Sequence, residues 1–317
     1  MVVAPTFGAP AGILPHASGH GTLVAMRVMV NVNGTIAGRD HAVIPVFDHG
    51  FLYGEGIYET LRTYQGRPFL VDRHMTRLRT SAAMIALTLP LSDAEIEARV
   101  AATIAAAGMA PGEEAYIRLL VTRGVGDLTY DPAACPEPSV VIIVKPQVDP
   151  PDEAFTRGVK ASLVSIVRNH PATVNPLIKS NNLLNCALAM QEAYTRGAFE
   201  GIMRNYRGEL AECTTANLFV VRGGTLLTPP LESGLLAGIT RAFVLEIAAA
   251  LGVPAREAVL HDDDLFAADE AFLTSTTREL VPITTVDEST IGDGRPGPVT
   301  ARLLAEFRRR ASTPGVR

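Results

Sequence analysis

Several short apolar segments of the chain are typical of β-strands, and some of them alternate between hydrophobic and polar residues with a period of two. In the first of them, RVMVNVNGTIAG, the alternation is centred on Asn33-Gly34, a dipeptide that favours a two-residue hairpin turn. In the last, a cluster of hydroxyl residues at 275–277 separates two apolar runs. Strands are therefore predicted within residues 27–38, 115–124, 139–146, 199–230 and 271–287.

Other segments place hydrophobic residues three or four positions apart, which predicts amphipathic helices. One of them opens with Ser92 and Glu95, the spacing of a capping box, and ends at Gly108. Helices of this kind are predicted at 70–86, 92–108, 238–252 and 296–310.

Strands and helices are mixed in both halves of the chain, which predicts an α+β or mixed α/β protein, and a length of 317 residues agrees with two domains. The segment PQVDPPDE, at 146–153, has three prolines and three acidic residues between two apolar strands, so it is the best candidate for a linker. The predicted division is a flexible lead-in at 1–26, a small domain at 27–147, a linker at 148–153, a large domain at 154–310 and a tail at 311–317.

The composition narrows the classes of function. With 47% apolar and 19% charged residues the protein is of the globular kind, and its net charge of −5 disfavours nucleic acid or an anionic membrane as partner. No apolar run reaches the roughly 18 residues of a membrane-spanning helix, and the N-terminal stretch lacks the basic residues of a signal peptide.

Cys135, Cys186 and Cys213 are far apart, which favours reduced thiols and a cytoplasmic location. The acidic run 262–264 is interpreted as a helix N-terminus, and no metal site is expected.

Lysine is rare in this protein, since 25 arginines stand beside only three lysines, Lys145, Lys160 and Lys179. An arginine cannot replace a lysine where an uncharged amine must act as nucleophile, because its guanidinium stays protonated. Lys179 opens the apolar stretch 183–190, which is predicted to be a buried helix in which an ammonium is poorly solvated. Lys179 is therefore a candidate for a reactive amine.

Two short stretches could bind a phosphate group. Gly238 leads into a helix whose first amides, at Ile239 and Thr240, lack partners within the helix, and such helix starts bind anions. The hydroxyl cluster at 275–277 directly follows an apolar strand. The alternatives are an ordinary helix start and an exposed turn.

Glu212 and three arginines are further candidates for residues of a functional site. Glu212 ends a strand and could simply cap the following turn, and Arg77, on the helix at 70–86, could lie on a solvated face. Arg118 and Arg123 lie on one apolar strand, and the alternation of side chains sends them to opposite faces. One of the two is therefore expected near a cleft or an interface.

These stretches resemble the class IV aminotransferases, the fold-type-IV enzymes that depend on pyridoxal phosphate, from Val30 to Val286. DHGFLYGEGIYETLRTY followed by HMTRL looks like the N-terminal domain of the family, and the pattern from Glu212 through Asn217 and Phe219 to LAGITR fits its signature. FLTSTTREL stands where the second phosphate loop belongs. The resemblance implies a small N-terminal α/β domain, a larger C-terminal β-barrel-like domain and at least a homodimer.

The resemblance also implies roles for single residues. Lys179 would form a Schiff base with pyridoxal phosphate and then shuttle the α-proton of the substrate, with a pKa lowered by burial. Glu212 would face the pyridine nitrogen and keep it protonated, and Leu236 would pack on the ring. The phosphate would be bound by Arg77, Gly238, Ile239, Thr240, Ser275 and Thr276.

The resemblance extends to two kinds of transaminase. YIRLLVTRGVGDL is similar to the branched-chain amino-acid enzymes, in which the residues matching Tyr116 and Arg118 receive substrate carboxylates. Its VTRG element also resembles the D-amino-acid enzymes, in which the residue matching Arg123 binds the α-carboxylate. Leu184, where the branched-chain enzymes commonly have a tyrosine, and Cys213, in place of a glycine, depart from the branched-chain pattern.

The hypothesis drawn from these likenesses is transfer of an amino group from an aliphatic, branched-chain L-amino acid to 2-oxoglutarate. KSNNLL is at least as similar to the D-specific enzymes and to aminodeoxychorismate lyase. A transaminase for D-alanine or D-glutamate and a lyase are therefore the alternatives. The substrate pocket is predicted to be lined by Phe51, Tyr58, Tyr116, Arg118, Leu120, Arg123 and Thr277.

Overall fold

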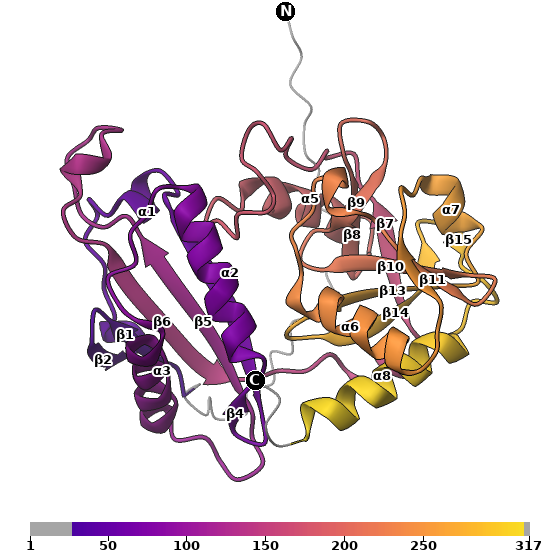
Figure 1. Cartoon of the computed structure of the whole chain (residues 1–317), viewed down its shortest axis with the longest axis horizontal. Helices are drawn as coiled ribbons and strands as arrows, with labels where there is room; N and C mark the ends of the chain where they lie inside the picture. The colour runs from indigo at the N-terminus through magenta and orange to yellow at the C-terminus, as the bar shows by residue number, and fades with distance from the viewer. Residues whose placement is uncertain (1–26, 314–317) are drawn as a thin grey trace, which may run out of the picture.

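The structure is a computed structural model that describes residues 27–313. It contains two β-sheets, one from the first half of the described chain and one from the second, and Figure 1 shows them side by side. Each sheet has its own helices and its own hydrophobic core. The predicted mixed α/β fold is confirmed. The predicted lead-in at 1–26 and the end of the predicted tail, 314–317, lie outside the described residues.

The first sheet has six strands in the order β2-β1-β6-β5-β3-β4, and all neighbours are antiparallel. Its first hairpin turns at Asn33 and Gly34, whose φ angles of 51° and 97° lie in the left-handed region, so the predicted Asn-Gly turn is confirmed. The strands are β1 Met29–Val32, β2 Thr35–Gly38, β3 Gly56–Tyr64, β4 Arg67–Pro68, β5 Ala115–Thr122 and β6 Ser139–Pro146.

Helices α2 (Val71–Met84) and α3 (Asp93–Ala107) cover one face of this sheet, as Figure 1 shows. Alternate residues of β3 and β5, such as Ile57 and Ile117, are fully buried in the core beneath the two helices. The residues between them point to the opposite face, because side chains alternate along a strand. That opposite face supplies part of the site described below. Shorter helical turns are η1 Arg39–His41, α1 His49–Leu52 and η2 Pro132–Ala134.

The second sheet has nine strands and curls into a half-barrel (Figure 1). Eight strands follow the order β12-β11-β10-β13-β14-β7-β8-β9, and β15 pairs with β14. The strands are β7 Val159–Leu163, β8 Glu200–Arg204, β9 Leu210–Cys213, β10 Asn217–Arg222, β11 Thr225–Thr228, β12 Ala255–Glu257, β13 Glu270–Ser275, β14 Glu279–Val286 and β15 Ser289–Thr290. The helices are α4 Asp152–Thr156, α5 Leu184–Thr195, α6 Ile239–Ala250, α7 Asp262–Phe266 and α8 Pro298–Ala311, with the turn η3 Leu231–Ser233.

The structure corrects the prediction of a buried helix that starts near Lys179. Helix α5 begins only at Leu184, and Lys179 lies in the loop before it. Leu184 and Leu188 are 66% and 43% exposed, whereas Ala189 and Ala193 are buried. The helix therefore buries a face of small residues and exposes its leucines, the reverse of what its apolar composition suggested.

The segment between the two sheets is partly helical, because α4 begins inside the predicted linker at 148–153. The acidic run 262–264 forms the first turn of α7, as predicted. No helix within residues 27–313 is long and apolar enough to cross a membrane. The same part of the chain contains no cluster of His, Cys, Asp and Glu side chains that could hold a metal ion.

Candidate active site

A cavity of about 470 Å³ lies between the two sheets, lined by residues of both. Strands β3 and β5 of the first sheet contribute Tyr58, Thr60, Tyr116 and Arg118. The second half contributes the loop before α5, the end of β9, the start of α6 and the turn after β13. Predicted site residues that line the cavity from this side are Lys179, Glu212, Leu236, Gly238, Ile239, Thr240, Ser275, Thr276 and Thr277.

The backbone of Lys179 is fixed from two sides. Its N–H donates to Ser81 Oγ at 3.1 Å, and its carbonyl accepts from the Tyr58 N–H at 2.9 Å. The side chain extends so that Nζ lies 4.5 Å from the centre of the Tyr58 ring. Burial, together with the positive charges of Arg77 and Arg118, lowers the pKa of the Lys179 amine to about 8.

This pKa leads to a testable expectation, because an amine attacks an aldehyde only in its neutral form. The rate at which Lys179 forms an adduct with a small aldehyde is expected to rise with pH and to level off above pH about 8. Borohydride trapping followed by peptide mass spectrometry measures that rate at a single lysine. A rate that keeps rising to the pKa of an ordinary lysine, about 10.4, would contradict the expectation.

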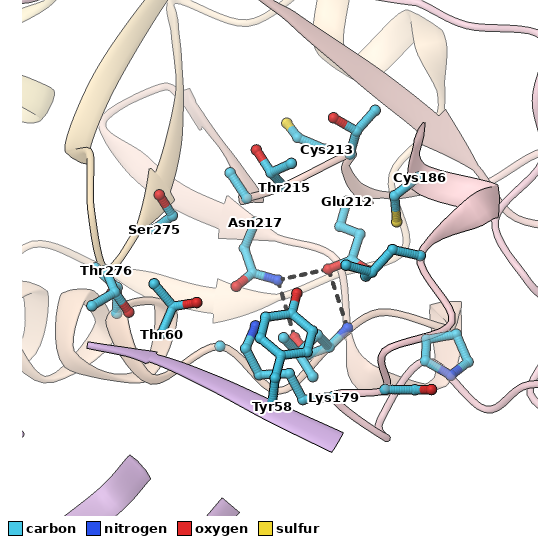
Figure 2. Close-up of a pocket in the computed structure, with 18 of the residues that line it drawn as sticks. Tyr58, Thr60, Lys179, Cys186, Glu212, Cys213, Thr215, Asn217, Ser275 and Thr276 are labelled. Atoms are coloured by element: carbon cyan, nitrogen blue, oxygen red, sulfur yellow. Dashed lines mark hydrogen bonds between the residues drawn. The ribbon is translucent and has the colours of Figure 1, made fainter. Parts of the chain in front are cut away.

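Glu212, near the end of strand β9, is held by three donors. Arg168 Nε donates to Oε1 at 2.8 Å, while the Leu236 N–H and Asn217 Nδ2 donate to Oε2 at 3.1 Å and 3.3 Å. Figure 2 shows Glu212 and Asn217 joined by this hydrogen bond at the wall of the cavity. Burial raises the pKa of Glu212, and the charge and hydrogen bond of Arg168 oppose that rise.

The two predicted anion-binding stretches meet in this cavity. Gly238 is the N-cap of α6, and the first amides of the helix, at Ile239 and Thr240, have no acceptors within it. A Cβ at position 238 would lie 1.8 Å from Asn217 Oδ1, so only glycine allows the helix start to approach so closely. The turn at 275–277 lines the same cavity, and Figure 2 shows two of its side chains there.

Arg77 extends from α2 to the start of α6. Its Nη1 donates to the Ala237 carbonyl at 3.0 Å, and its Nε and Nη2 donate to the two oxygens of Glu59 at 2.7 Å. Glu59 is fully buried and also contacts His74 Nδ1 at 2.7 Å. Although burial acts to raise the pKa of Glu59, Arg77 and His74 outweigh it and hold that pKa well below its usual range. The orientation of Arg77 is thus fixed by a buried carboxylate that also binds a histidine.

Arg118 differs from the other arginines at the cavity. Arg77, Arg168 and Arg278 each form an ion pair with a glutamate, whereas Arg118 has no carboxylate partner within the described part of the chain. Its Cζ lies 4.1 Å from the centre of the Tyr58 ring, a cation–π contact. Burial raises the pKa of Tyr58 to about 12, so its hydroxyl stays protonated at neutral pH. Arg118 can therefore receive an anion.

Three predicted substrate residues do not line the cavity. Phe51 lies on α1 with 66% of its surface exposed, and Leu120 lies further along β5 than the cavity extends. Arg123 is buried, and its guanidinium is occupied, because it donates to Glu55 at 2.8 Å and to two backbone carbonyls. Of the two arginines that the strand pattern left open, Arg118 is the one at the cavity.

Two arginines that line the cavity, Arg168 and Arg278, were not predicted from the sequence. Arg168 lies in an irregular loop after β7, where no periodic pattern marks it. Arg278 donates to the fully buried Glu200 at 2.8 Å and also bonds Thr215, so it joins the turn at 275–277 to the turn before β10. Each of the two arginines forms an ion pair with a glutamate that is distant in the sequence, and no sequence pattern marks such pairs.

Comparisons with known proteins agree on one family. The sequence profile described as amino-transferase class IV matches residues 56–286. A Methanocaldococcus jannaschii protein with a provisional branched-chain-amino-acid aminotransferase name is 37% identical over 279 residues, covering 88% of this chain and 95% of that protein. The D-alanine aminotransferase of Listeria monocytogenes is 34% identical over 285 residues, with 89% and 95% covered. The aminodeoxychorismate lyase of Bacillus subtilis is 32% identical over 281 residues, with 89% and 94% covered.

Solved structures show the same fold. The branched-chain amino acid aminotransferase of Escherichia coli superposes with a TM-score of 0.83 at 33% identity, over 88% of this chain and 93% of that one. A second branched-chain amino acid aminotransferase, from T.th., gives a TM-score of 0.83 at 28% identity, over 90% and 94% of the two chains. That second protein was solved in complex with N-(5'-phosphopyridoxyl)-L-glutamate.

Proposed function

This chain belongs to the class IV aminotransferase family, and on that premise we propose that it transfers the amino group of an aliphatic, branched-chain L-amino acid to 2-oxoglutarate. The observation that carries the proposal is the meeting of Lys179, Glu212 and Arg118 in one cavity. Lys179 supplies an amine of lowered pKa, and Glu212 a carboxylate that is held by three donors. Arg118 supplies a guanidinium that has no carboxylate partner among the described residues.

Pyridoxal phosphate, the cofactor of this family, fits the donors in the cavity. The start of α6 and the turn at 275–277 offer amides and hydroxyls suited to a phosphate, and Arg77 adds a positive charge beside them. The absent Cβ of Gly238 leaves room at the helix start. The residues proposed for the cofactor are Lys179 for its aldehyde, Glu212 for its ring nitrogen, Leu236 for its ring, and Arg77, Gly238, Ile239, Thr240, Ser275 and Thr276 for its phosphate.

When bound, the cofactor supplies an aldehyde that takes up the amino group and a ring that withdraws electrons from the α-carbon. Lys179 would supply a neutral amine to that aldehyde, and its Nζ would carry the α-proton of the substrate. Glu212, as a carboxylate, would keep the ring nitrogen protonated. Arg118 binds a substrate carboxylate, and the Tyr58 ring lies in contact with both Arg118 and the Lys179 amine.

Apolar side chains in the cavity support an aliphatic substrate. Val174, Ile178 and Leu183 line it together with Arg118. Burial of a substrate side chain against them contributes about 25 cal/mol per Å² of apolar surface. The names of similar proteins cover branched-chain and D-alanine transaminases and a lyase, so they support the reaction class more strongly than the substrate. A D-amino-acid transaminase is the second candidate, because the run KSNNLL is at least as similar to the D-specific enzymes and to aminodeoxychorismate lyase as to the branched-chain enzymes.

A steady-state assay with purified protein, pyridoxal phosphate and single amino acids tests the proposal. With 2-oxoglutarate as the acceptor, kcat/KM is expected to be higher for L-leucine, L-valine and L-isoleucine than for D-alanine. Activity confined to D-alanine or D-glutamate would favour the second candidate. Release of pyruvate from aminodeoxychorismate without an amino acceptor would identify a lyase.

Replacing Arg118 with leucine is expected to raise KM for both substrates by about 10- to 100-fold, since a hydrogen bond to a charged group is worth roughly 1.5–3 kcal/mol. Steady-state kinetics with L-leucine and 2-oxoglutarate measure the change. Arg123→Leu is the matched control. Arg123 is a buried arginine that directly follows β5, the strand of Arg118, but it lies outside the cavity. That variant is expected to lose thermal stability while KM stays near the wild-type value. An unchanged KM in Arg118→Leu would mean that the carboxylate binds elsewhere.

A further inference from the structure

We propose that Arg168 is a positioning residue that keeps Glu212 ionised and directed into the cavity, an inference that rests on the proposed function of Glu212. Arg168 Nε lies 2.8 Å from Glu212 Oε1, and the two side chains are only 11% and 7% exposed. A buried carboxylate without a counter-charge takes up a proton rather than remain ionised. An arginine meets this need at every pH at which the enzyme works, because its guanidinium does not lose its proton.

Few other charged groups face Glu212. Lys179 is the second cation that acts on it, while Cys186 and Cys213 are thiols whose pKa values are raised by burial, so both stay neutral. Under the proposed function the Lys179 amine is taken up by the cofactor aldehyde. Arg168 then remains the permanent positive charge beside the carboxylate.

Arg168 is itself anchored at several points. Its backbone N–H donates to the Arg204 carbonyl at 2.8 Å, and its Nη1 donates to Asn185 Oδ1 at 3.3 Å. Asn185 Nδ2 in turn donates to the Val167 carbonyl at 2.8 Å. The end of β8 thus fixes the backbone of Arg168 and the first turn of α5 fixes its guanidinium, and through it the direction of the Glu212 carboxylate.

The test is Arg168→Met, which removes the charge and keeps most of the bulk. Loss of the cation raises the pKa of the carboxyl, so the acid limb of the pH profile of kcat/KM is expected to move up by about 1–3 pH units. The visible absorbance of bound pyridoxal phosphate, titrated with pH in the absence of substrate, is expected to shift in the same direction. Arg168→Lys, which keeps a positive charge, is expected to restore part of the shift in both titrations.

Two further variants separate this role from a merely structural one. Arg168→Gln keeps a hydrogen-bond donor without the charge, and both titrations must shift upward in it as well. In a Glu212→Gln background, Arg168→Met should no longer shift either titration, because the group on which it acts is gone.

Arg204→Met is the matched control, since Arg204 forms an ion pair with Asp262 at 2.6 Å outside the cavity, and its loss should leave both titrations unchanged. If Arg168→Met or Arg168→Gln folds, binds pyridoxal phosphate and titrates like the wild type, the inference is overturned. A wild-type protein that neither binds pyridoxal phosphate nor transaminates would overturn the proposed function instead.

Discussion

Replacing Lys179 with alanine is expected to abolish transamination, with kcat lowered by at least about 10⁴-fold. The substitution removes both the amine that attacks the cofactor aldehyde and the group that carries the α-proton. The phosphate donors at Gly238 and at 275–277 remain, so pyridoxal phosphate is expected to bind without a covalent bond. The measurements are the rate of glutamate formation from L-leucine and 2-oxoglutarate, and the protein mass after borohydride trapping.

Lys160→Ala is the matched control for this experiment. Lys160 forms an ion pair with Glu288 at 3.0 Å, and the Glu288 side chain is 94% exposed, so the pair contributes little to stability. This variant is expected to retain wild-type kcat and the trapped adduct. A Lys179→Ala protein that still transaminates, or that still gains the mass of the cofactor on trapping, would show that another residue carries the reaction.

The second large effect is expected for Glu212→Gln, which should lower kcat by roughly 10²- to 10³-fold, the range observed when a preorganised charge-stabilising group is removed. Glutamine has the size and shape of glutamate but no negative charge. The ring nitrogen then loses the anion that keeps it protonated, and the α-proton is removed more slowly. Steady-state kcat and the dissociation constant of pyridoxal phosphate, measured together, are expected to separate a large change in rate from a small change in binding.

Glu270→Gln is the control for the loss of a buried carboxylate. Glu270 accepts hydrogen bonds from the Val299 and Thr300 N–H groups at the start of α8, and it lies outside the cavity. Its variant is expected to melt at a lower temperature and to keep wild-type kcat. If Glu212→Gln behaved in the same way, Glu212 would have only a structural role.

The elements that the sequence predicted well are those fixed by short-range rules. The turn at Asn33-Gly34 needs positive φ angles, and the helix that follows Ser92 needs partners for its first amides, so a few residues suffice to locate each of them. The same holds for Gly238, because a helix was predicted to start directly after it and α6 does start there. What these local rules could not supply is the meeting of that helix start with the turn at 275–277, which the likeness to a known family implied.

Features that depend on long-range packing were harder to predict. Strand alternation sent Arg118 and Arg123 to opposite faces, but only the position of the second sheet decides which face borders the cavity. The pairing of Arg168 with Glu212 joins two segments by a contact that no sequence period records.

The exposed leucines of α5 are a further example. An apolar helix was expected to be buried, and the structure instead leaves Leu184 and Leu188 accessible. The helix packs instead through the small residues Ala189 and Ala193, and apolar composition alone does not tell which face of a helix is buried.

The most direct test of the proposed reaction is a single-turnover absorbance spectrum of the purified protein with bound pyridoxal phosphate, recorded as single L- and D-amino acids are added without an acceptor. A visible band that depends on Lys179 is expected. It should be lost when L-leucine or L-valine is added, because each enzyme molecule then converts one equivalent of amino acid to the 2-oxo acid. Loss of the band with D-amino acids alone would contradict the proposed substrate. A protein that shows no such band after reconstitution with pyridoxal phosphate would contradict the assignment of Lys179 and of the cofactor.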